Sequence, residues 1–415
     1  MPERNYTGFV KHCQICSNPK LTEILSLGHQ PIVQYYLTKQ ALYEPESTYP
    51  LTLVRCGHCG LLQLNYIIDP RNVFPLHYPY RTGLTNMLIK NFQELAETTA
   101  RLGFFKKGDL IVDIGSNDGT LLQAFKDKGM QVLGVEPTNA AKDANARGIK
   151  TLQEFFSANS VKTILKKYGS ARIITATNVF AHINDTESLV KNIKALMDNE
   201  SMFISESQYL MDIIEKLEFD TIYHEHLRIY SLKPLRYLFR TYGLSLIDAE
   251  RISAAGGSIR VYAKKGKHPI SARAKKLMAA EKKAGLNDEK TLLLFAQKTH
   301  HAKNDLLALL LKCKKSGGRI VGLTSSARSN TLLGFSHIDN TLIDYSCEKK
   351  GSPKIGLYTP GTHIPVVDEA VLFKEQPEYA LVLSWHIGEE LAKIIKKLGY
   401  KGKFILPLPR AHIVL

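Results

Sequence analysis

The feature that most constrains the fold of this chain is the stretch from Leu110 to Phe125, LIVDIGSNDGTLLQAF. It begins with a short apolar run, residues 110–114, of the kind that a buried parallel strand requires. Small and polar residues form a tight turn at 115–119, and apolar residues then recur at helical spacing: Leu121, Leu122 and Phe125. A strand, turn and helix in this order present backbone N–H groups and a helix N-terminus to a ligand. The sequence therefore predicts an α/β domain with a ligand site at this turn.

The spacing of the glycines distinguishes among the nucleotide-binding folds. No Gly-Lys-Ser/Thr follows the turn, and it does not supply the Gly-x-Gly-x-x-Gly of dinucleotide folds. It resembles the first loop of class I S-adenosylmethionine (SAM) methyltransferases, where an acid stands two residues before a Gly-x-Gly-x-Gly loop. The matching cofactor-binding candidates are Asp113, Gly115, Asn117 and Gly119. Asn117 replaces the middle glycine, which is tolerable because asparagine adopts left-handed backbone readily.

A second strand is predicted over Gln131–Val135, and Glu136 follows it. In the fold that the loop resembles, an acid at this position accepts hydrogen bonds from both ribose hydroxyls of SAM. The resemblance implies this role for Glu136. The alternative interpretation is an ordinary strand–turn–helix followed by an unrelated glutamate.

Further strands are predicted over 172–177 and 202–206, with helices between the strands. Such alternation gives a parallel sheet with right-handed crossovers, and the ligand lies at the carboxyl ends of its strands. Three polar residues collect at these ends: Glu136, Asn178 and Glu206. His182 lies one helical turn beyond Asn178, so both can face the cleft, although a packing role for this histidine is an equal alternative.

The length and charge of the chain set wider limits. At 415 residues the chain is too long for one core, so two or three domains are expected. No apolar run approaches the length of a membrane span and no signal peptide is recognisable, which predicts a cytoplasmic location and no membrane partner. The formal charge of +16 is spread over helices without a dense patch interleaved with aromatic residues, so it suits an anionic substrate and predicts no nucleic-acid partner. A monomer is favoured.

Two Cys-x-x-Cys pairs are the clearest metal signal: Cys13, Cys16, Cys56 and Cys59. Two thiolates three residues apart bind one edge of a tetrahedral Zn²⁺, and the second pair completes the shell. In a reducing compartment such pairs favour a metal over disulfides. Because four cysteine ligands leave no open position, the predicted zinc is structural. The long spacing between the pairs predicts a small insertion over residues 21–53.

An aromatic, proline-containing linker follows at residues 74–83, and an amphipathic helix is predicted over 87–102. A domain boundary is expected near this linker. Its Tyr78 and Tyr80 either pack locally or reach over the cofactor cleft, since segments between domains often line ligand sites.

The densest chemical stretch is FDTIYHEHLRIYS, residues 219–231. Its histidines are two residues apart, so it is not the His-Glu-x-x-His of metalloproteases. On extended backbone, His224 and His226 would share one face while Tyr223 and Glu225 share the other. A histidine that titrates near neutrality suits proton abstraction, and a neighbouring carboxylate can fix its tautomer. Alternation alone does not choose between the two histidines, and a polar loop beside a sheet is the alternative.

These motifs occur in a recognisable order along the chain: the four cysteines, DIGSNDG at 113–119, GVEP at 134–137, NVFAH at 178–182, FDTIYHEH at 219–226, GGSIRV at 256–261 and PGTHIP at 360–365. Together they resemble the sugar C-methyltransferase family of deoxysugar biosynthesis, which methylates keto sugars attached to a nucleoside diphosphate. The resemblance spans nearly the whole chain, and Tyr-His-Glu-His is specific to that family.

The resemblance implies an α/β protein of three domains: a zinc-binding domain over 1–80, a SAM-binding Rossmann-like domain over 81–250 and a second Rossmann-like domain over 251–415. It implies SAM and structural zinc as cofactors and a nucleotide-linked 4-keto sugar as substrate, methylated at C3. It also implies that His226 is the general base, supported by Tyr223 and Glu225. The expected site further includes His182, Tyr78, Tyr80 and, as a substrate contact, His224.

The carboxyl-terminal part is predicted as a second α/β sheet, with a helix over 304–315 and strands over 319–324, 342–345, 379–383 and 403–406. It lacks a cofactor fingerprint. Candidates for the substrate diphosphate are Arg328, Lys354 and His363. Arg328 and Ser329 stand where many relatives carry lysine and glycine, which leaves the particular sugar and nucleotide open.

Two rival functions remain at this point. An RNA methyltransferase would use the zinc knuckle and the positive charge to bind nucleic acid, with a steep dependence of affinity on salt. A zinc-containing binding module with an inactive Rossmann domain would show no affinity for SAM.

Overall fold

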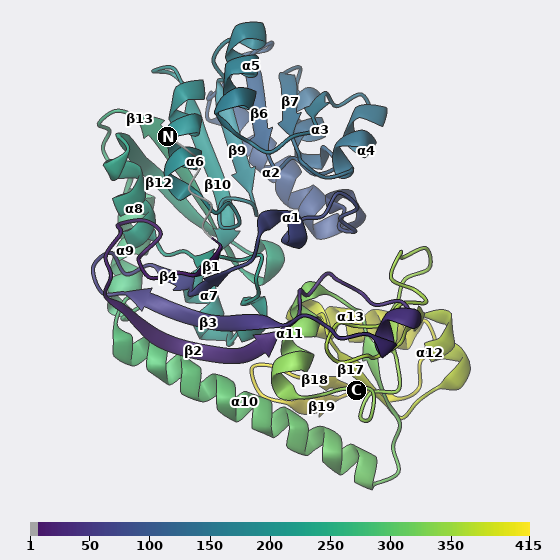
Figure 1. Cartoon of the computed structure of the whole chain (residues 1–415). Coiled ribbons are helices and arrows are strands. Elements are labelled where there is room, and N and C mark those ends of the chain that lie inside the picture. The colour runs from purple at the N-terminus through teal and green to yellow at the C-terminus, as the bar shows by residue number, and fades with distance from the viewer. Residues whose placement is uncertain (1–6) are drawn as a thin grey trace.

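The computed structural model describes residues 7–415. Three larger sheets carry the described chain, in the strand orders β12-β13-β10-β9-β6-β7-β8, β11-β4-β3-β2 and β16-β15-β14-β17-β18-β19, and β1 pairs with β5 in a small fourth sheet. Figure 1 shows the seven-stranded sheet at the top, the four-stranded sheet below it and the six-stranded sheet at the lower right. The three larger sheets meet around the segment 219–231.

The central sheet is the predicted parallel α/β sheet. Its strands are β6 (Leu110–Ile114), β7 (Gln131–Val135), β8 (Thr151–Leu152), β9 (Ile173–Thr177), β10 (Met202–Gln208), β12 (Leu244–Ile252) and β13 (Ser258–Lys265). The first five are parallel, and β13 lies antiparallel between β10 and β12. All five residues of β6 are buried because helices cover both faces.

Helices cover the two faces of this sheet. On one face lie α2 (Asn86–Arg101) and α3 (Thr120–Lys126), and on the other α5 (Ala158–Tyr168), α6 (Thr186–Leu196) and α8 (Leu232–Thr241). The remaining helices of this part are α4 (Ala140–Ala146) and α7 (Leu210–Lys216). The helix predicted over 87–102 is α2, with Leu88, Phe92 and Leu95 buried. Leu102, the last residue of the predicted helix, is exposed, because the helix ends at Arg101.

The four-stranded sheet is built by the amino-terminal third and one later strand. Its members are β2 (Leu21–Gln30), β3 (Tyr49–Cys56), β4 (Leu62–Leu64) and β11 (Arg228–Ile229), all antiparallel. The predicted insertion over 21–53 contains the β2–β3 pair. The short β1 (Gly8–Phe9), β5 (Tyr66–Ile67) and α1 (Pro70–Val73) complete this part. β11 follows the His-Glu-His segment, residues 224–226, so this segment leads directly into the sheet whose strand β3 ends at Cys56.

The carboxyl-terminal sheet comprises β14 (Ile320–Leu323), β15 (Ser346–Glu348), β16 (Val366–Asp368), β17 (Tyr379–Val382), β18 (Lys403–Leu406) and β19 (His412–Val414). Its helices are α11 (Ala327–Ser336), α12 (Ala370–Glu375) and α13 (Gly388–Lys397). The strand predicted over 342–345 is wrong: the strand begins at Ser346. Asp339 accepts the backbone N–H groups of residues 341–343 on its side chain and carbonyl, which holds them in a turn.

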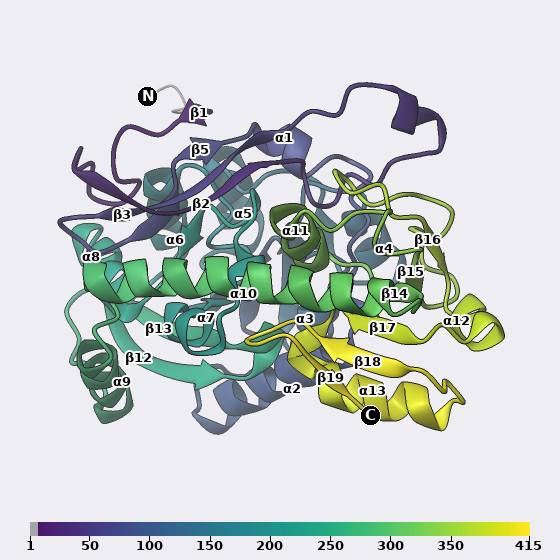
Figure 2. The ribbon, with the colours of Figure 1, turned by 90° about the horizontal axis from the view of Figure 1, so that it is seen from below.

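A long helix, α10 (Glu289–Lys315), joins the parts after α9 (Ala272–Lys283). It contacts β2, α11 and β14, and Figure 2 shows it running across the molecule from the α8 side to the carboxyl-terminal sheet.

The predicted domain ranges 81–250 and 251–415 stay a prediction. Strand β13 belongs to the central sheet although it lies beyond residue 250. Among residues 7–415, no helix combines the length and apolar character that a membrane crossing needs.

Candidate functional site

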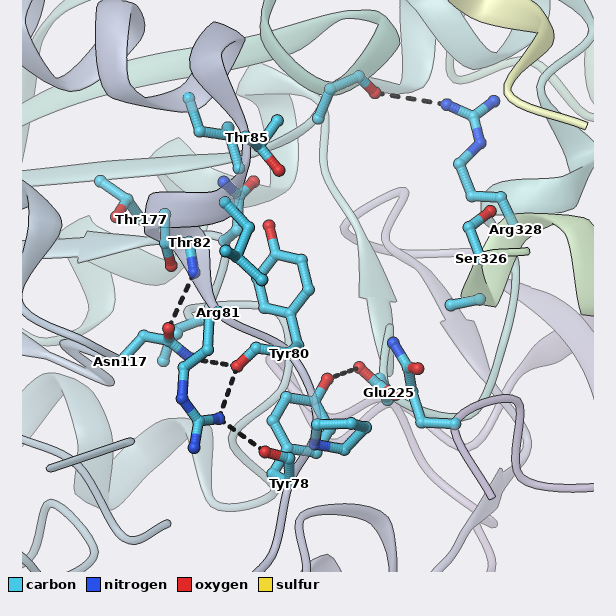
Figure 3. Close-up of a pocket in the computed structure, with 18 of the residues that line it drawn as sticks. Tyr78, Tyr80, Arg81, Thr82, Thr85, Asn117, Thr177, Glu225, Ser326 and Arg328 are labelled. Atoms are coloured by element: carbon cyan, nitrogen blue, oxygen red, sulfur yellow. Dashed lines mark hydrogen bonds between the residues drawn. The ribbon is translucent and has the colours of Figure 1, made fainter. Parts of the chain in front are cut away.

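A cleft of about 2200 Å³ lies at the carboxyl ends of the central strands and extends to the carboxyl-terminal sheet. Figure 3 shows Tyr78, Tyr80 and Glu225 on one side of it and Ser326 and Arg328 on the other. The predicted catalytic residues all line it: Tyr78, Tyr80, His182, Tyr223, Glu225 and His226. The cofactor candidates in its wall are Asp113, Gly115, Asn117, Glu136 and Asn178, and the substrate candidates are Arg328 and Lys354. Gly119, His224 and His363 are not part of the wall.

The loop after β6 has the geometry that its small residues allow. Gly115 has φ +65°, and a Cβ there would lie 2.5 Å from the side chain of Val179. Asn117 takes a left-handed φ of 48°, as predicted for a residue in place of glycine. Gly119, outside the cleft wall, is the N-cap of α3 and also has positive φ. The loop thus exposes backbone rather than side chains to the cleft.

Acidic side chains surround this loop. Glu136 is buried and accepts hydrogen bonds from the backbone N–H groups of Asn117 and Thr138, at 3.0 and 2.9 Å. Asp113 accepts one from the Thr175 hydroxyl at 2.6 Å, and burial raises the pKa of Asp113 to about 7 against that hydrogen bond. The residues fit a SAM ribose and amino-acid moiety, which offer hydroxyl and ammonium donors to such carboxylates.

Asn178 leaves an acceptor unused at the end of β9. Its Oδ1 atom is buried and has no hydrogen-bond partner among residues 7–415. Its φ of 56° and the hydrogen bond from its N–H to the Glu206 carbonyl (2.9 Å) hold the backbone in place. A buried, unpaired amide oxygen costs free energy unless a ligand donates to it, which also fits a bound cofactor.

The linker of residues 78–82 is tied to the cofactor loop by Asn117. The Oδ1 of Asn117 accepts from the Thr82 N–H at 3.0 Å, and its Nδ2 donates to the Tyr80 carbonyl at 3.2 Å (Figure 3). Arg81 donates to the carbonyls of Tyr78 and Tyr80. The linker therefore lies over the loop, which fixes Tyr78 and Tyr80 in the cleft.

The His-Glu-His segment is a tight turn rather than extended backbone. The His226 N–H donates to the Tyr223 carbonyl at 2.8 Å, so the predicted alternation of faces is wrong. Tyr223, Glu225 and His226 all reach the cleft. His224 lies on the other side, with its Nε2 3.2 Å from the Pro50 carbonyl oxygen.

The surroundings of His226 define its tautomer. Its Nδ1 lies 2.6 Å from the Thr221 carbonyl oxygen, which can only accept, so Nδ1 carries the proton. The Nε2 lone pair then faces the cleft, where the Gln208 amide lies 3.2 Å away and donates to it. Burial lowers the pKa of His226 to about 4, although the Thr221 carbonyl opposes the shift. The imidazole is therefore neutral at neutral pH.

His182 stacks against His226, with 5.1 Å between the ring centroids, and Phe74 stacks on its other side at 5.6 Å. The His182 Nε2 is buried and unpaired within the described chain. The predicted helical turn across 178–182 is wrong: the left-handed Asn178 prevents it, and the His182 N–H closes a turn onto the Val179 carbonyl at 2.8 Å. Burial lowers the pKa of His182 well below its usual value, and the nearby His226 and Arg228 lower it further.

Glu225 and the tyrosines complete this side of the cleft. The Tyr78 hydroxyl donates to Glu225 Oε2 at 2.8 Å, while Oε1 is buried and has no partner among the described residues. Burial raises the pKa of Glu225 to about 7, with the Tyr78 hydrogen bond opposing. The Tyr223 ring lies 4.0 Å from the His226 ring, centroid to centroid, and burial raises the pKa of its phenol well above the usual value.

The three diphosphate candidates differ in their surroundings. Arg328 donates to both carboxylate oxygens of Asp220, at 3.0 and 2.8 Å, so its charge is already balanced. Lys354 donates to the Ser325 carbonyl at 2.5 Å and lies 3.5 Å from a Glu348 carboxylate oxygen, at the cleft wall. His363 pairs with Glu46 at 3.3 Å, outside the wall.

Three contributors escaped the sequence reasoning. Gln208 follows Glu206 by two residues on a strand, so the period of two could have placed it on the same face. Asp220 lies in the FDTIYHEH motif, but no role was predicted for it. Arg228 gave no signal, because its partners other than the Tyr230 hydroxyl are backbone carbonyls and a side chain far along the chain.

The four cysteines of the two pairs meet at one point. Their Sγ atoms all lie within 4.8 Å of one another, with Cys13–Cys59 and Cys16–Cys56 each at 3.5 Å. Tetrahedral zinc with Zn–S bonds of about 2.3 Å places sulfurs about 3.8 Å apart, so the donor set fits. The described residues contain no second group of three or more potential metal ligands.

Comparison with known proteins agrees with this geometry. Family models match residues 13–74 (zinc binding domain), 87–249 (methyltransferase domain) and 253–409 (C-methyltransferase C-terminal domain). The C-methyltransferase NovU of Streptomyces niveus is 29% identical over 409 residues, which cover 98% of this chain and 97% of NovU. The protein is a SAM-dependent C-methyltransferase. In this C-methyltransferase the four-cysteine cluster lies within the matched zinc-binding domain.

Solved structures align with less than half of the C-methyltransferase. Magnesium protoporphyrin IX methyltransferase from Synechocystis PCC 6803 with bound SAH is 12% identical, with a TM-score of 0.34, and the match covers 43% of this chain and 84% of that one. A SAM-dependent methyltransferase from Clostridium acetobutylicum is 11% identical, with a TM-score of 0.34, covering 43% and 92%.

Proposed function

We propose that this C-methyltransferase acts on a 4-keto sugar linked to a nucleoside diphosphate, methylates C3, and uses His226 as general base. The observation that carries the proposal is the His226 tautomer. Its Nε2 lone pair faces a cleft that also contains the Glu136 carboxylate at the end of β7. A basic nitrogen beside a SAM site suits removal of a carbon-bound proton.

The chemistry explains why a base is needed. A sugar carbon is not a nucleophile, but a neighbouring ketone acidifies its C–H bond. Transfer of that proton to His226 Nε2 leaves an enolate, whose carbon can attack an electrophile. SAM, when bound, supplies an electrophilic methyl group, and the S–C bond pair stays on the sulfur. A positioned base contributes about 10²–10⁴-fold to such a reaction.

Other residues of the turn suit the ketone oxygen. Because burial raises the pKa of Tyr223, its phenol stays protonated and can donate a hydrogen bond to the enolate oxygen. Gln208 holds the Nε2 edge of His226 before substrate enters. Tyr78 and Glu225 support one another through their hydrogen bond, and His182 packs the base from its other face. We propose no substrate role for His224 or His363, since neither lines the cleft.

The charges of the cleft residues suggest which of them contact SAM and which contact the diphosphate of the substrate. We propose that Glu136 accepts the ribose hydroxyls of SAM and that Asp113 and Asn178 accept from its remaining polar groups. For the diphosphate, Lys354 is the stronger candidate, because Glu348 lies 3.5 Å from it as a looser partner, whereas both carboxylate oxygens of Asp220 accept hydrogen bonds from Arg328. Lys349 and Lys350 lie in the same cleft wall and add positive charge there.

The test is incubation of the purified enzyme with SAM and a panel of nucleotide-linked keto sugars, followed by mass spectrometry. The expected result is a product heavier by one methylene unit, with the new methyl on the carbon next to the ketone by NMR. Methylation of oxygen, or of carbon in a substrate without a ketone, would contradict the proposal. The same nucleotide sugar with the ketone reduced to an alcohol is the matched control and should stay unmodified.

A further inference from the structure

Arg228 is a fully buried cation with no acidic partner. It begins β11, two residues after His226, and is 1% exposed. Among residues 7–415, its guanidinium donates to no carboxylate: its hydrogen bonds go to the Gln14 side chain, the Tyr230 hydroxyl and backbone carbonyls within residues 180–183. Because burying an unpaired charge is costly, the protein must compensate this guanidinium in another way.

Its hydrogen bonds join two segments that are far apart in sequence. On one side, Nη1 donates to Gln14 Oε1 at 2.5 Å. On the other, Nη2 contacts the carbonyls of Phe180 and Ala181, at 3.5 and 3.4 Å, and donates to that of Ile183. The planar guanidinium presents several donors in a fixed arrangement, which suits a bridge of this kind.

The first segment is the zinc knuckle. Gln14 stands between Cys13 and Cys16, and its N–H donates to Gln63 Oε1 at 2.8 Å. Gln63 in turn pairs with Arg228 in the β4–β11 register. Gln14 is thus held by the same turn that places the zinc thiolates. Four thiolates around Zn²⁺ would carry a net charge of −2, and Gln14, which lies between Cys13 and Cys16, links this site to the guanidinium.

The second segment is the turn that carries His182. The carbonyls that Arg228 contacts belong to residues on both sides of His182, whose ring stacks on His226. Asn178 begins this turn in a left-handed conformation, and no regular helix or strand holds it before α6. The guanidinium therefore supplies hydrogen bonds that the backbone of the turn does not make for itself.

We propose that Arg228 is a positioning residue that couples the zinc knuckle to the His182 turn. The zinc–thiolate cluster balances its charge, Gln14 fixes its direction, and its Nη2 holds residues 180–183. Zinc in this enzyme thus supports the candidate base as well as the amino-terminal fold. Only the importance of His182 for catalysis rests on the proposed function; the coupling itself does not.

Hydrogen exchange of the full-length enzyme, saturated with S-adenosylhomocysteine, tests the coupling without any sugar. Removal of zinc with a chelator should speed amide exchange in residues 179–184 by about tenfold or more, the effect of losing one charge-assisted hydrogen bond. Exchange in the cofactor strand β7 should stay unchanged. If the His182 turn keeps its protection in zinc-free enzyme, the proposal is overturned.

Single-residue variants distinguish loss of the Arg228 hydrogen bonds from a general loss of folding. Gln14→Met removes the acceptor on the knuckle side and should speed exchange in 179–184 while zinc content stays at one per chain. Arg228→Gln removes the charge and should have the larger effect; if it does not fold, Gln14→Met still decides. Arg55→Gln is the matched control, because Arg55 adjoins Cys56 but donates to the Asn287 carbonyl, away from the turn. Equal effects of Gln14→Met and Arg55→Gln would contradict the proposal.

Discussion

The cofactor side and the base side of the cleft are built in different ways. The cofactor side comes from one stretch, residues 113–136, plus Asn178, and its hydrogen bonds run mostly between neighbouring loops of one sheet. The base side takes Tyr78 from the linker, His182 from the turn after β9, Gln208 from β10 and the turn at 223–226. Hydrogen bonds also connect this side to more distant parts of the chain: Arg228 bonds to Gln14 in the zinc knuckle, and Arg328 of α11 bonds to Asp220.

This difference has a consequence for mutation. Changes in the distant parts of the molecule should impair proton abstraction more than SAM affinity, since they act on the supports of the base. Changes in the loop after β6 or at the end of β7 should do the reverse. The two functions can be measured separately: calorimetry reports SAM binding, and exchange of the substrate hydrogen in deuterated water reports the base.

The largest expected effect comes from His226→Asn, which removes the basic nitrogen and keeps a polar side chain. With S-adenosylhomocysteine bound, exchange of the hydrogen next to the ketone should fall by at least about 10²-fold, and methylation with it. SAM affinity should stay at the wild-type value. His224→Asn is the control and should retain most of both rates, because His224 contacts β3 outside the cleft. Wild-type exchange in His226→Asn would assign the base elsewhere.

Glu136→Ala should produce the opposite pattern. It loses the carboxylate proposed to accept two ribose hydroxyls, and each charge-assisted hydrogen bond contributes about 1.5–3 kcal/mol at most. SAM affinity should drop at least about tenfold by calorimetry, since about 1.4 kcal/mol corresponds to one decade. Exchange of the keto sugar measured without cofactor should be unaffected. Unchanged SAM affinity would place the ribose at another residue.

Asn117→Gly tests the contact between the two sides. Glycine adopts the φ of 48° easily and keeps the N–H that Glu136 accepts, so the loop should survive. The two side-chain hydrogen bonds to the linker disappear, each contributing about 0.5–1.5 kcal/mol. We expect substrate exchange to slow several-fold through a less ordered Tyr78, with SAM affinity changed by less than about threefold. A larger loss of SAM affinity than of exchange would mean that Asn117 acts on the cofactor instead.

The smallest expected effect is that of pH. Because burial lowers the pKa of His226 to about 4, its imidazole is charged only in acid and is a competent base throughout the neutral range. Burial raises the pKa of Glu225 to about 7, so the measurement is made in Glu225→Gln. Burial raises the pKa of Asp113 at the cofactor site to about 7 as well, so exchange is measured without cofactor. Substrate exchange by this variant should then be flat between about pH 6 and pH 8, whereas a histidine of ordinary pKa, about 6.5, would lose activity on acidification in this range. A fall centred near 6.5 would refute the buried, neutral state of His226.

The comparison also explains which parts of the site the sequence could predict. The strand–turn–helix at 110–125, the acid at the end of β7 and the four cysteines all depend on residue type at short spacing, and each lies where it was predicted. The turn at 223–226 was predicted as extended backbone because nothing within four residues announces the Tyr223–His226 hydrogen bond. The strand at 346–348 was placed too early for a similar reason, since Asp339 holds residues 341–343 in a turn.

The sequence by itself determined the local chemistry of this C-methyltransferase: a glycine-containing cofactor loop, a closed thiolate shell and a histidine-rich segment. Only the tertiary structure decided which histidine faces the cleft, because that depends on the Thr221 carbonyl fixing one ring nitrogen and on β3 enclosing His224. It also decided that Arg328 pairs with Asp220 and that Arg228 joins the zinc knuckle to the His182 turn. The hydrogen bonds of His224, Arg328 and Arg228 to partners more than a hundred positions away leave no periodic signal in the chain, whereas the paired cysteines and the glycines of the cofactor loop stand at fixed, short spacing.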